Sequence, residues 1–193
     1  MPEPTTRDIK LIQYLNEAYG KEKELETALQ AHIGMTTRRS YKQRLQKHLR
    51  ETKGHARAVE RRIKQLGGKP EPVPEVLTEA ADAVTSVASK AVAAAKGPLH
   101  MLRGTGEEEK LLKNAKTEYS EEAEEIATYT AIETLADAVG DRETAKVARS
   151  IRRDEERMHH YLEGLIPQLT RAVARAEIPA SERNGGRRRR RSS

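Results

Sequence analysis

Apolar residues recur at alternating spacings of four and three along much of this chain, and this spacing constrains the fold most. A spacing of this kind places side chains on one face of an α-helix, here called a seam, and the strict alternation that marks a strand is missing. Ala, Leu, Glu, Lys and Arg dominate the sequence and favour helix. The sequence therefore predicts an all-α protein. The first seam contains Leu11, Leu15, Ala18, Glu22, Leu25 and Leu29.

Glycines and prolines divide the pattern into four long helices, over residues 6–32, 37–66, 107–139 and 142–175. We expect Gly34 to end the first helix, the glycines at 67–68 the second, and Gly140 the third, with Asp141 capping the fourth. Pro167 predicts a kink or an early end in the fourth helix.

The helices form two tight hairpins joined by a crossover of about 40 residues, which includes a small-residue segment over 80–95 that predicts one or two short helices. Two hairpins with one long crossover form a four-helix bundle of ferritin-like topology. We expect this bundle to occupy residues 1–175 and a disordered, Arg-rich tail to occupy residues 176–193.

Composition excludes several classes of function. None of the 193 residues is Cys, so disulfides, zinc–thiolate sites, iron–sulfur clusters and a thiol nucleophile are excluded. Without Phe or Trp, the chain cannot build the usual platform for stacking nucleobases. No apolar run approaches the roughly 20 residues of a membrane span, and no signal peptide is evident. We therefore expect a cytoplasmic protein with no membrane partner.

The positive charge is confined to the C-terminal segment. Eight Arg and two Glu after residue 170 account for the whole net charge of +6, so the body is neutral. Such a tail predicts salt-sensitive contact with nucleic acid or another polyanion, and a merely solvated tail is the alternative. The candidate polyanion-binding residues are Arg183, Arg187, Arg188, Arg189, Arg190 and Arg191.

Acidic residues occupy places in the seams where apolar residues belong. Glu22 lies on the first seam, Glu122 and Glu125 lie on the inner side of the third helix, Glu155 follows Ile151 on the fourth, and Glu51 flanks the second seam. Any one of these glutamates, taken alone, is most simply interpreted as a solvent-exposed residue. Several converging carboxylates require a cation, because a buried unpaired charge is very costly.

The register of the two hairpins places these carboxylates at one height. Glu22 and Glu51 lie at similar separations before and after Met35, where the first turn is expected. Glu125 and Glu155 lie equally far before and after Gly140, in the second turn. At the helical rise of about 1.5 Å per residue, all four lie about 20 Å from the turns. The sequence therefore predicts one polar layer across the bundle.

Histidines strengthen the prediction of a metal site. His55 and His159 each follow a glutamate by four residues, and His159 also follows Glu156 by three, the spacing found in carboxylate-bridged di-metal bundles. Ordinary helix ion pairs are the alternative. Carboxylate-rich sites with two histidines suit iron or manganese, so we expect two Fe or two Mn ions. The candidate ligands are Glu22, Glu51, His55, Glu122, Glu125, Glu155, Glu156 and His159.

Other polar residues near this layer are candidates to support the ligands. Tyr19 and Tyr129 lie about one turn from Glu22 and Glu125, and each would either donate a hydrogen bond to a metal ligand or simply pack in the core. His48, one turn before the predicted ligand Glu51, is expected to support a ligand. His32, near a helix C-terminus, is expected to be a surface residue favoured by the helix dipole.

Three segments resemble the YciE/YciF-like branch of the ferritin-like superfamily: AYGKEKEL at 18–25, HLRETKGH at 48–55 and EAEEIATY at 122–129. The resemblance covers about residues 6–170 and implies a four-helix bundle, usually dimeric, that is associated with bacterial stress responses. It also implies a di-metal site similar to those of rubrerythrins and manganese catalases. The fourth helix departs from the pattern, with DEERMHH at 154–160, which leaves Glu155 and Glu156 as alternative ligands.

Two functions of different classes follow. The first is a di-iron or di-manganese oxidoreductase, acting on hydrogen peroxide or dioxygen in the manner of a catalase, peroxidase or ferroxidase. The second is a non-enzymatic stress or binding protein with a structural metal site, whose Arg-rich tail contacts nucleic acid or another polyanion.

Overall fold

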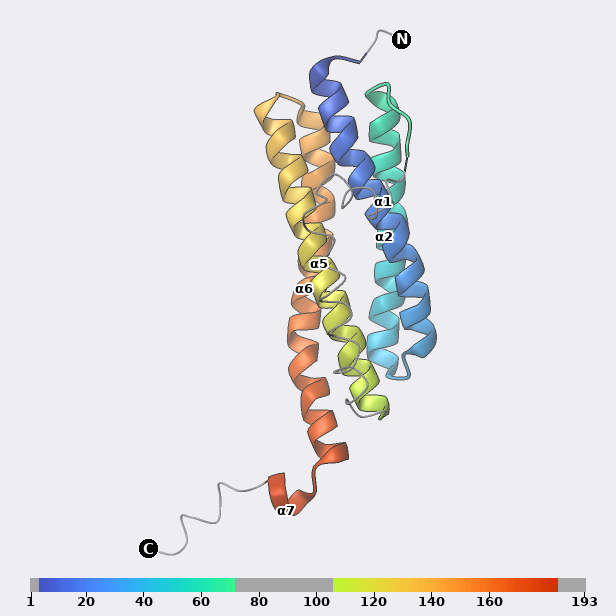
Figure 1. The fold of residues 1–193 in the computed structure, drawn as a ribbon, viewed down its shortest axis with the longest axis vertical. Coiled ribbons are helices and arrows are strands. Elements are labelled where there is room, and N and C mark those ends of the chain that lie inside the picture. The colour runs from blue at the N-terminus through green and yellow to red at the C-terminus, as the bar shows by residue number, and fades with distance from the viewer. Residues whose placement is uncertain (1–3, 72–105, 184–193) are drawn as a thin grey trace, which may run out of the picture.

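The computed structural model describes residues 4–71 and 106–183, and these form long helices that run side by side (Figure 1). Within these ranges the secondary structure is entirely helical, as the 4-3 seams predict. The prediction of short helices over residues 80–95 lies outside the described residues. The helices are α1 (Thr6–Met35), α2 (Arg39–Gln65), α5 (Glu107–Ala138), α6 (Arg142–Glu177) and the short α7 (Ala180–Arg183).

The four long helices form an antiparallel bundle of ferritin-like topology. Helix α1 packs along α2 and α5 along α6 as two hairpins, and the hairpins meet where α1 contacts α5 and α2 contacts α6 (Figure 1). Short turns close each hairpin, whereas the connection from α2 to α5 spans some 40 residues. The predicted fold class is confirmed.

Local signals set most of the helix ends. Thr5 and Asp8 form a capping box at the start of α1. Gly140, with a φ of 75°, ends α5, and Asp141 caps α6. The prediction for Gly34 is wrong: α1 continues to Met35, and the buried Thr36 follows as its C-cap.

Helix α6 is longer than its sequence predicts. Pro167 does not end it, and the helix continues to Glu177. Leu165 and Leu169, on either side of the proline, are buried in the core, and their burial offsets the lost backbone hydrogen bond. Residues 176 and 177 and α7 are helical, although we expected disorder from residue 176. The rest of the predicted tail, 184–193, lies outside the described residues.

The apolar core is divided into two clusters along the bundle. One, the upper cluster, contains residues near the α5–α6 turn, such as Leu11, Ile63 and Ile132. The other, the lower cluster, lies near the α1–α2 turn and includes Leu29, Leu45 and Leu162. On every long helix the buried residues between these clusters are mainly polar. The bundle therefore encloses a polar layer between two apolar clusters.

Candidate metal centre

The polar layer is assembled from residues on the seams of all four long helices. Each of these residues is at most 6% exposed. A 4-3 spacing on each helix aims their side chains at the bundle axis, as it does the leucines above and below them. The layer contains Glu22 from α1, His48, Thr52 and His55 from α2, Glu122 and Glu125 from α5, and Glu155 from α6.

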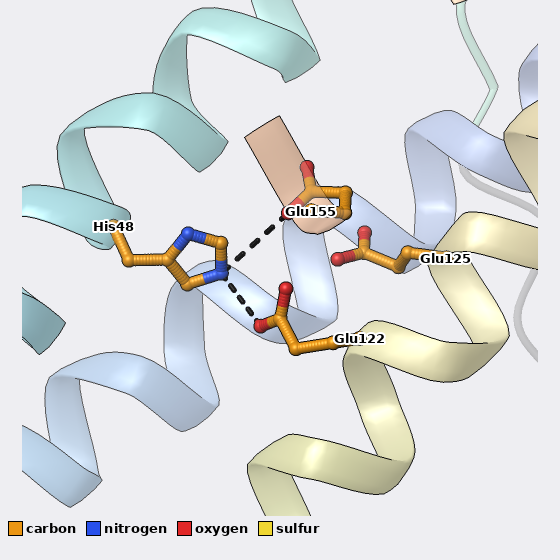
Figure 2. A group of neighbouring side chains, drawn as sticks. All are labelled: His48, Glu122, Glu125 and Glu155. Carbon is orange, nitrogen blue, oxygen red and sulfur yellow. Dashed lines mark ion pairs between the residues drawn. The ribbon is translucent and has the colours of Figure 1, made fainter. Parts of the chain in front are cut away.

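One group of possible ligands converges from three helices. His48, Glu122, Glu125 and Glu155 each offer one donor atom, and these atoms all lie within 4.8 Å of one another. The Nε2 atom of His48 lies 2.7 Å from Glu122 and 3.7 Å from Glu155. In Figure 2 the four side chains point toward a common centre.

A second group shares one carboxylate with the first. Glu22, His55 and Glu155 also bring donor atoms within 4.8 Å of one another. The Nδ1 atom of His55 lies 2.8 Å from Glu155 and 3.6 Å from Glu22. Glu155 belongs to both groups, so two cations held here would lie on either side of it.

Most donor atoms of the layer have no hydrogen-bond partner among the described residues. Both oxygens of Glu122, Glu125 and Glu155 are buried without a hydrogen-bond partner. The two short nitrogen–oxygen approaches, from His48 to Glu122 and from His55 to Glu155, also lack hydrogen-bond geometry. Buried polar groups are nearly always satisfied, so these atoms fit cations that they would surround.

Burial shifts the pKa values of this layer strongly. It raises the pKa of Glu22 and of Glu122 to about 8, against the attraction of the neighbouring histidines. It raises the pKa of Glu125 well above its ordinary value, and the charges of Glu22 and Glu155 add to this. For His48, burial lowers the pKa, but Glu122 and Glu51 outweigh burial and raise it to about 10. Clustered shifts of this kind mark functional sites.

Each histidine of the layer has a carboxylate behind it. The Nε2 atom of His55 lies 3.2 Å from Asp154, opposite the nitrogen that faces the cluster. The Nδ1 atom of His48 lies 3.6 Å from Glu51, whose own carboxylate accepts a hydrogen bond from Arg44 at 2.9 Å. Carboxylates in this position orient ligating histidines and fix their tautomers.

The two tyrosines of the sequence analysis lie in different environments. The buried Tyr129 donates a hydrogen bond of 2.5 Å to Glu22 on α1 rather than to Glu125, its neighbour one turn away on α5. Tyr19 packs against the upper apolar cluster and lines a surface cleft between α1 and α2. It makes no hydrogen bond to a member of the cluster in the described structure.

Three of the predicted ligands lie outside the cluster. Glu51 faces Arg44 and Lys47 on the flank of α2. Glu156 pairs with Arg152 along the outer face of α6. The ring of His159 stacks on Tyr119 with ring centres 3.9 Å apart. Each lies one or more positions off the seam of its helix and is turned away from the bundle axis.

His48 reaches the cluster itself, although we expected it to support a ligand. Its signal is present in the sequence, because His48 follows Met35 by the same separation by which Glu22 precedes it. The seam of α5 runs through Leu111, Glu118 and Glu125, each one position before the less buried Leu112, Tyr119 and Ile126. Thr52, Glu118 and Asp154 were not among the candidates, although the first two occupy seam positions.

Of the predicted polyanion-binding residues, Arg183 lies exposed at the end of α7. Arg187–Arg191 lie outside the described residues. Among the described helices, none combines the length and apolar character that crossing a membrane requires.

Two antiparallel helix pairs joined by one long connection, with carboxylates and histidines at mid-height, define a ferritin-like protein. More particularly, a family described as a domain of unknown function (DUF892) matches residues 6–175, and the chain belongs to this family. The resemblance suspected from the sequence is thereby confirmed. No curated protein matches the chain.

Solved structures with the same fold come from several bacteria. A protein from Xanthomonas campestris is 22% identical, with a TM-score of 0.69, and the match covers 89% of this chain and 99% of that one. The Escherichia coli stress protein YciF is 22% identical, with a TM-score of 0.64 and coverage of 86% and 98%. A ferritin-like, diiron-carboxylate protein from Bacillus anthracis is 19% identical, with a TM-score of 0.61 and coverage of 84% and 99%.

Proposed function

We propose that this protein is a stress protein that binds two iron or two manganese ions and reacts with hydrogen peroxide or dioxygen. The observation that carries the proposal is the buried layer, in which carboxylates and histidines from four helices face one another without hydrogen-bond partners. The named relatives are consistent with it, since one is described as a stress protein and another as a diiron-carboxylate protein.

The charges of the layer fit two divalent cations. Four ionised glutamates carry four negative charges, and two divalent ions neutralise them with both histidines uncharged. Oxygen and imidazole donors without thiolate favour iron and manganese. Glu155, which belongs to both groups, would contribute to holding both ions. The proposed ligands are Glu22, His48, His55, Glu122, Glu125 and Glu155.

Two such ions, when bound, exchange electrons in pairs with peroxide or dioxygen. The protein residues would hold the ions in a dry site, because apolar clusters close the layer from above and below. Tyr129 holds one oxygen of Glu22 by its hydrogen bond and so fixes the direction of that carboxylate. Asp154 does the same for the ring of His55.

The proposal is tested by metal analysis and peroxide consumption. The wild-type chain, loaded with Fe or Mn, should hold two ions and consume hydrogen peroxide. Glu122→Ala should lose at least one ion and most of the turnover. Glu156→Ala, which removes a glutamate paired with Arg152 outside the cluster, is the matched control and should behave as wild type.

Different outcomes separate the two functions of the sequence analysis. A wild-type chain without stoichiometric metal, or unchanged turnover in Glu122→Ala, would reject the proposed centre. Two bound ions without consumption of peroxide or dioxygen would favour a structural metal site in a non-enzymatic protein.

A further inference from the structure

A second group of buried polar residues lies one helical turn below the metal centre, between α1, α2 and α5. Its central member is Glu118, which is fully buried and lies four residues before Glu122 on the seam of α5. One oxygen of Glu118 contacts the Nδ1 atom of His32 from α1. Its other oxygen is buried and has no hydrogen-bond partner among the described residues.

Two further polar groups are also buried and unsatisfied. The hydroxyl of Tyr41 from α2 is fully buried without a hydrogen-bond partner, and one oxygen of Glu121 is likewise buried and unpaired in the described structure. Glu121 lies three residues after Glu118 on α5, a spacing at which two side chains are neighbours on one side of a helix. Because Glu118 also contacts His32, the three side chains lie close to one another.

We propose that His32, Glu118 and Glu121 form an entry site at which divalent metal ions bind before they reach the buried centre. This proposal rests on the proposed metal centre, because the ions pass to it. An ion pair between His32 and Glu118 alone would fasten α1 to α5, but it leaves the second oxygen of Glu118 and the oxygen of Glu121 unexplained.

The geometry connects this site to both the surface and the centre. The side chain of His32 is 13% exposed and that of Glu118 is not exposed, so the pair leads from the surface into the core. Glu118, Glu122 and Glu125 follow at spacings of four and three on one face of α5. Neighbours at these spacings lie about 5–6 Å apart, so an ion moves from one carboxylate to the next without losing anionic ligands.

The charges around His32 favour the binding of cations more than the charges that line a surface cleft between α1 and α2. Near Glu121 the carboxylate of Glu124 pairs with Lys21 at 2.9 Å, so the two carboxylates of Glu118 and Glu121 face the single imidazole of His32. By contrast, the cleft, of about 230 Å³, has three basic and two acidic side chains among its lining residues. This cleft therefore offers a cation less negative charge. Its lining consists of Tyr19, Lys23, Glu26, Lys53, Ala56, Arg57 and Glu60.

The test measures how fast the metal-free, full-length protein takes up Co²⁺, from the visible absorption that coordination produces. His32→Ala and Glu118→Gln should load about tenfold more slowly than wild type, because each removes a donor group that binds the incoming ion first, and Glu118→Gln also removes a negative charge that attracts it. The final cobalt content should stay that of wild type. Asp137→Asn removes a solvent-exposed carboxylate near the other end of the same helix and should load at the wild-type rate.

A further variant distinguishes slower metal uptake from a folding defect. Glu121→Gln keeps the contact between His32 and Glu118 intact and should still slow loading, by about threefold. Equal loading rates in all variants would reject the entry site while leaving the metal centre in place. A lower final content at an unchanged rate would show that these residues hold the fold rather than admit ions. A wild-type chain that binds no cobalt would reject both proposals.

Discussion

At the scale of single residues, the face of the helix decides which polar side chain can bind a metal. Glu51 and His48 are only three positions apart on α2, yet His48 is fully buried in the cluster while Glu51 faces Arg44. The same difference separates Glu155 from Glu156 on α6. Residue type and approximate height are therefore not enough to identify a metal ligand. Successive side chains along a helix point in directions that differ by about 100°, so a neighbour of a ligand can face solvent.

This difference predicts opposite results for two isosteric substitutions. Glu51→Gln should retain two ions, with at most about a tenfold loss of affinity, because Glu51 acts only through the ring of His48. Glu125→Gln removes a buried carboxylate of the cluster and should lose one ion at the same metal concentration. Metal analysis after gel filtration measures both. The opposite ranking of the two variants would contradict this assignment.

Asp154 is predicted to position His55 without itself binding the metal. Asp154→Ala should weaken the binding of one ion by about 10–100-fold, since the ring of His55 loses the acceptor at 3.2 Å from its outer nitrogen. Arg157→Gln, which removes the other ion-pair partner of Asp154, is the control and should bind both ions normally. Titration of the metal-free protein with Mn²⁺ checks this. Unchanged affinity in Asp154→Ala would show that packing alone orients the ring.

At the scale of helices, a small set of polar contacts at the helix ends fixes the hairpins relative to each other. Asp141 accepts a hydrogen bond from the backbone of Thr144 at 3.0 Å and so caps α6. Its two oxygens also accept hydrogen bonds from Arg62, near the end of α2, at 2.9 and 2.7 Å. Asp141 therefore joins the two hairpins and aligns the heights on which the metal centre depends.

Asp141→Ala should lower the free energy of unfolding by about 2–4 kcal/mol, because it removes a helix cap and leaves the partly buried Arg62 unpaired. Burial raises the pKa of Asp141, but Thr144 and Arg62 outweigh burial and hold it below the ordinary 3.8. A lowered pKa gives stability that is present above 3.8 and is lost as the pH falls. Urea unfolding should thus show the full difference from wild type at pH 7 and a smaller one near pH 3. A difference independent of pH would contradict the role of this carboxylate.

At the scale of the whole molecule, charge and hydrophobicity are separated along the chain. The bundle is neutral overall and keeps its acidic layer between two apolar clusters, whereas the excess positive charge lies after residue 170. A neutral body argues against sequence-specific DNA recognition by the bundle, so we expect any contact with a polyanion to involve the tail.

We propose that the tail binds nucleic acid through its arginines without reading sequence. A chain that lacks residues 183–193 has six fewer Arg and should lose most of its affinity for duplex DNA. The slope of log affinity against log salt should become shallower by about 5, since each phosphate contact contributes about 0.9. Metal content and helicity should be unchanged. Equal affinity of the two chains for DNA would show that the tail does not contribute to DNA binding.

The sequence by itself determined the fold class, the two hairpins and the existence of a polar layer. The 4-3 seams and the glycines at 67–68 and 140 predict long helices and short turns, because these signals act over a few residues and need no tertiary contact. The register of the two hairpins likewise places Glu22, Glu51, Glu125 and Glu155 near one height, although Glu51 then faces Arg44 rather than the bundle axis.

Only the tertiary structure decided which side chains meet. A shift of one position in the seam of α5 brings Glu118 into the core, and its partner across the bundle, His32, comes from α1, which is distant in the sequence. Likewise, Asp154 reaches His55 only because α2 and α6 are neighbours in the bundle. These contacts depend on the rotation of each helix about its axis, and that rotation is set by the packing of the whole core rather than by any local signal.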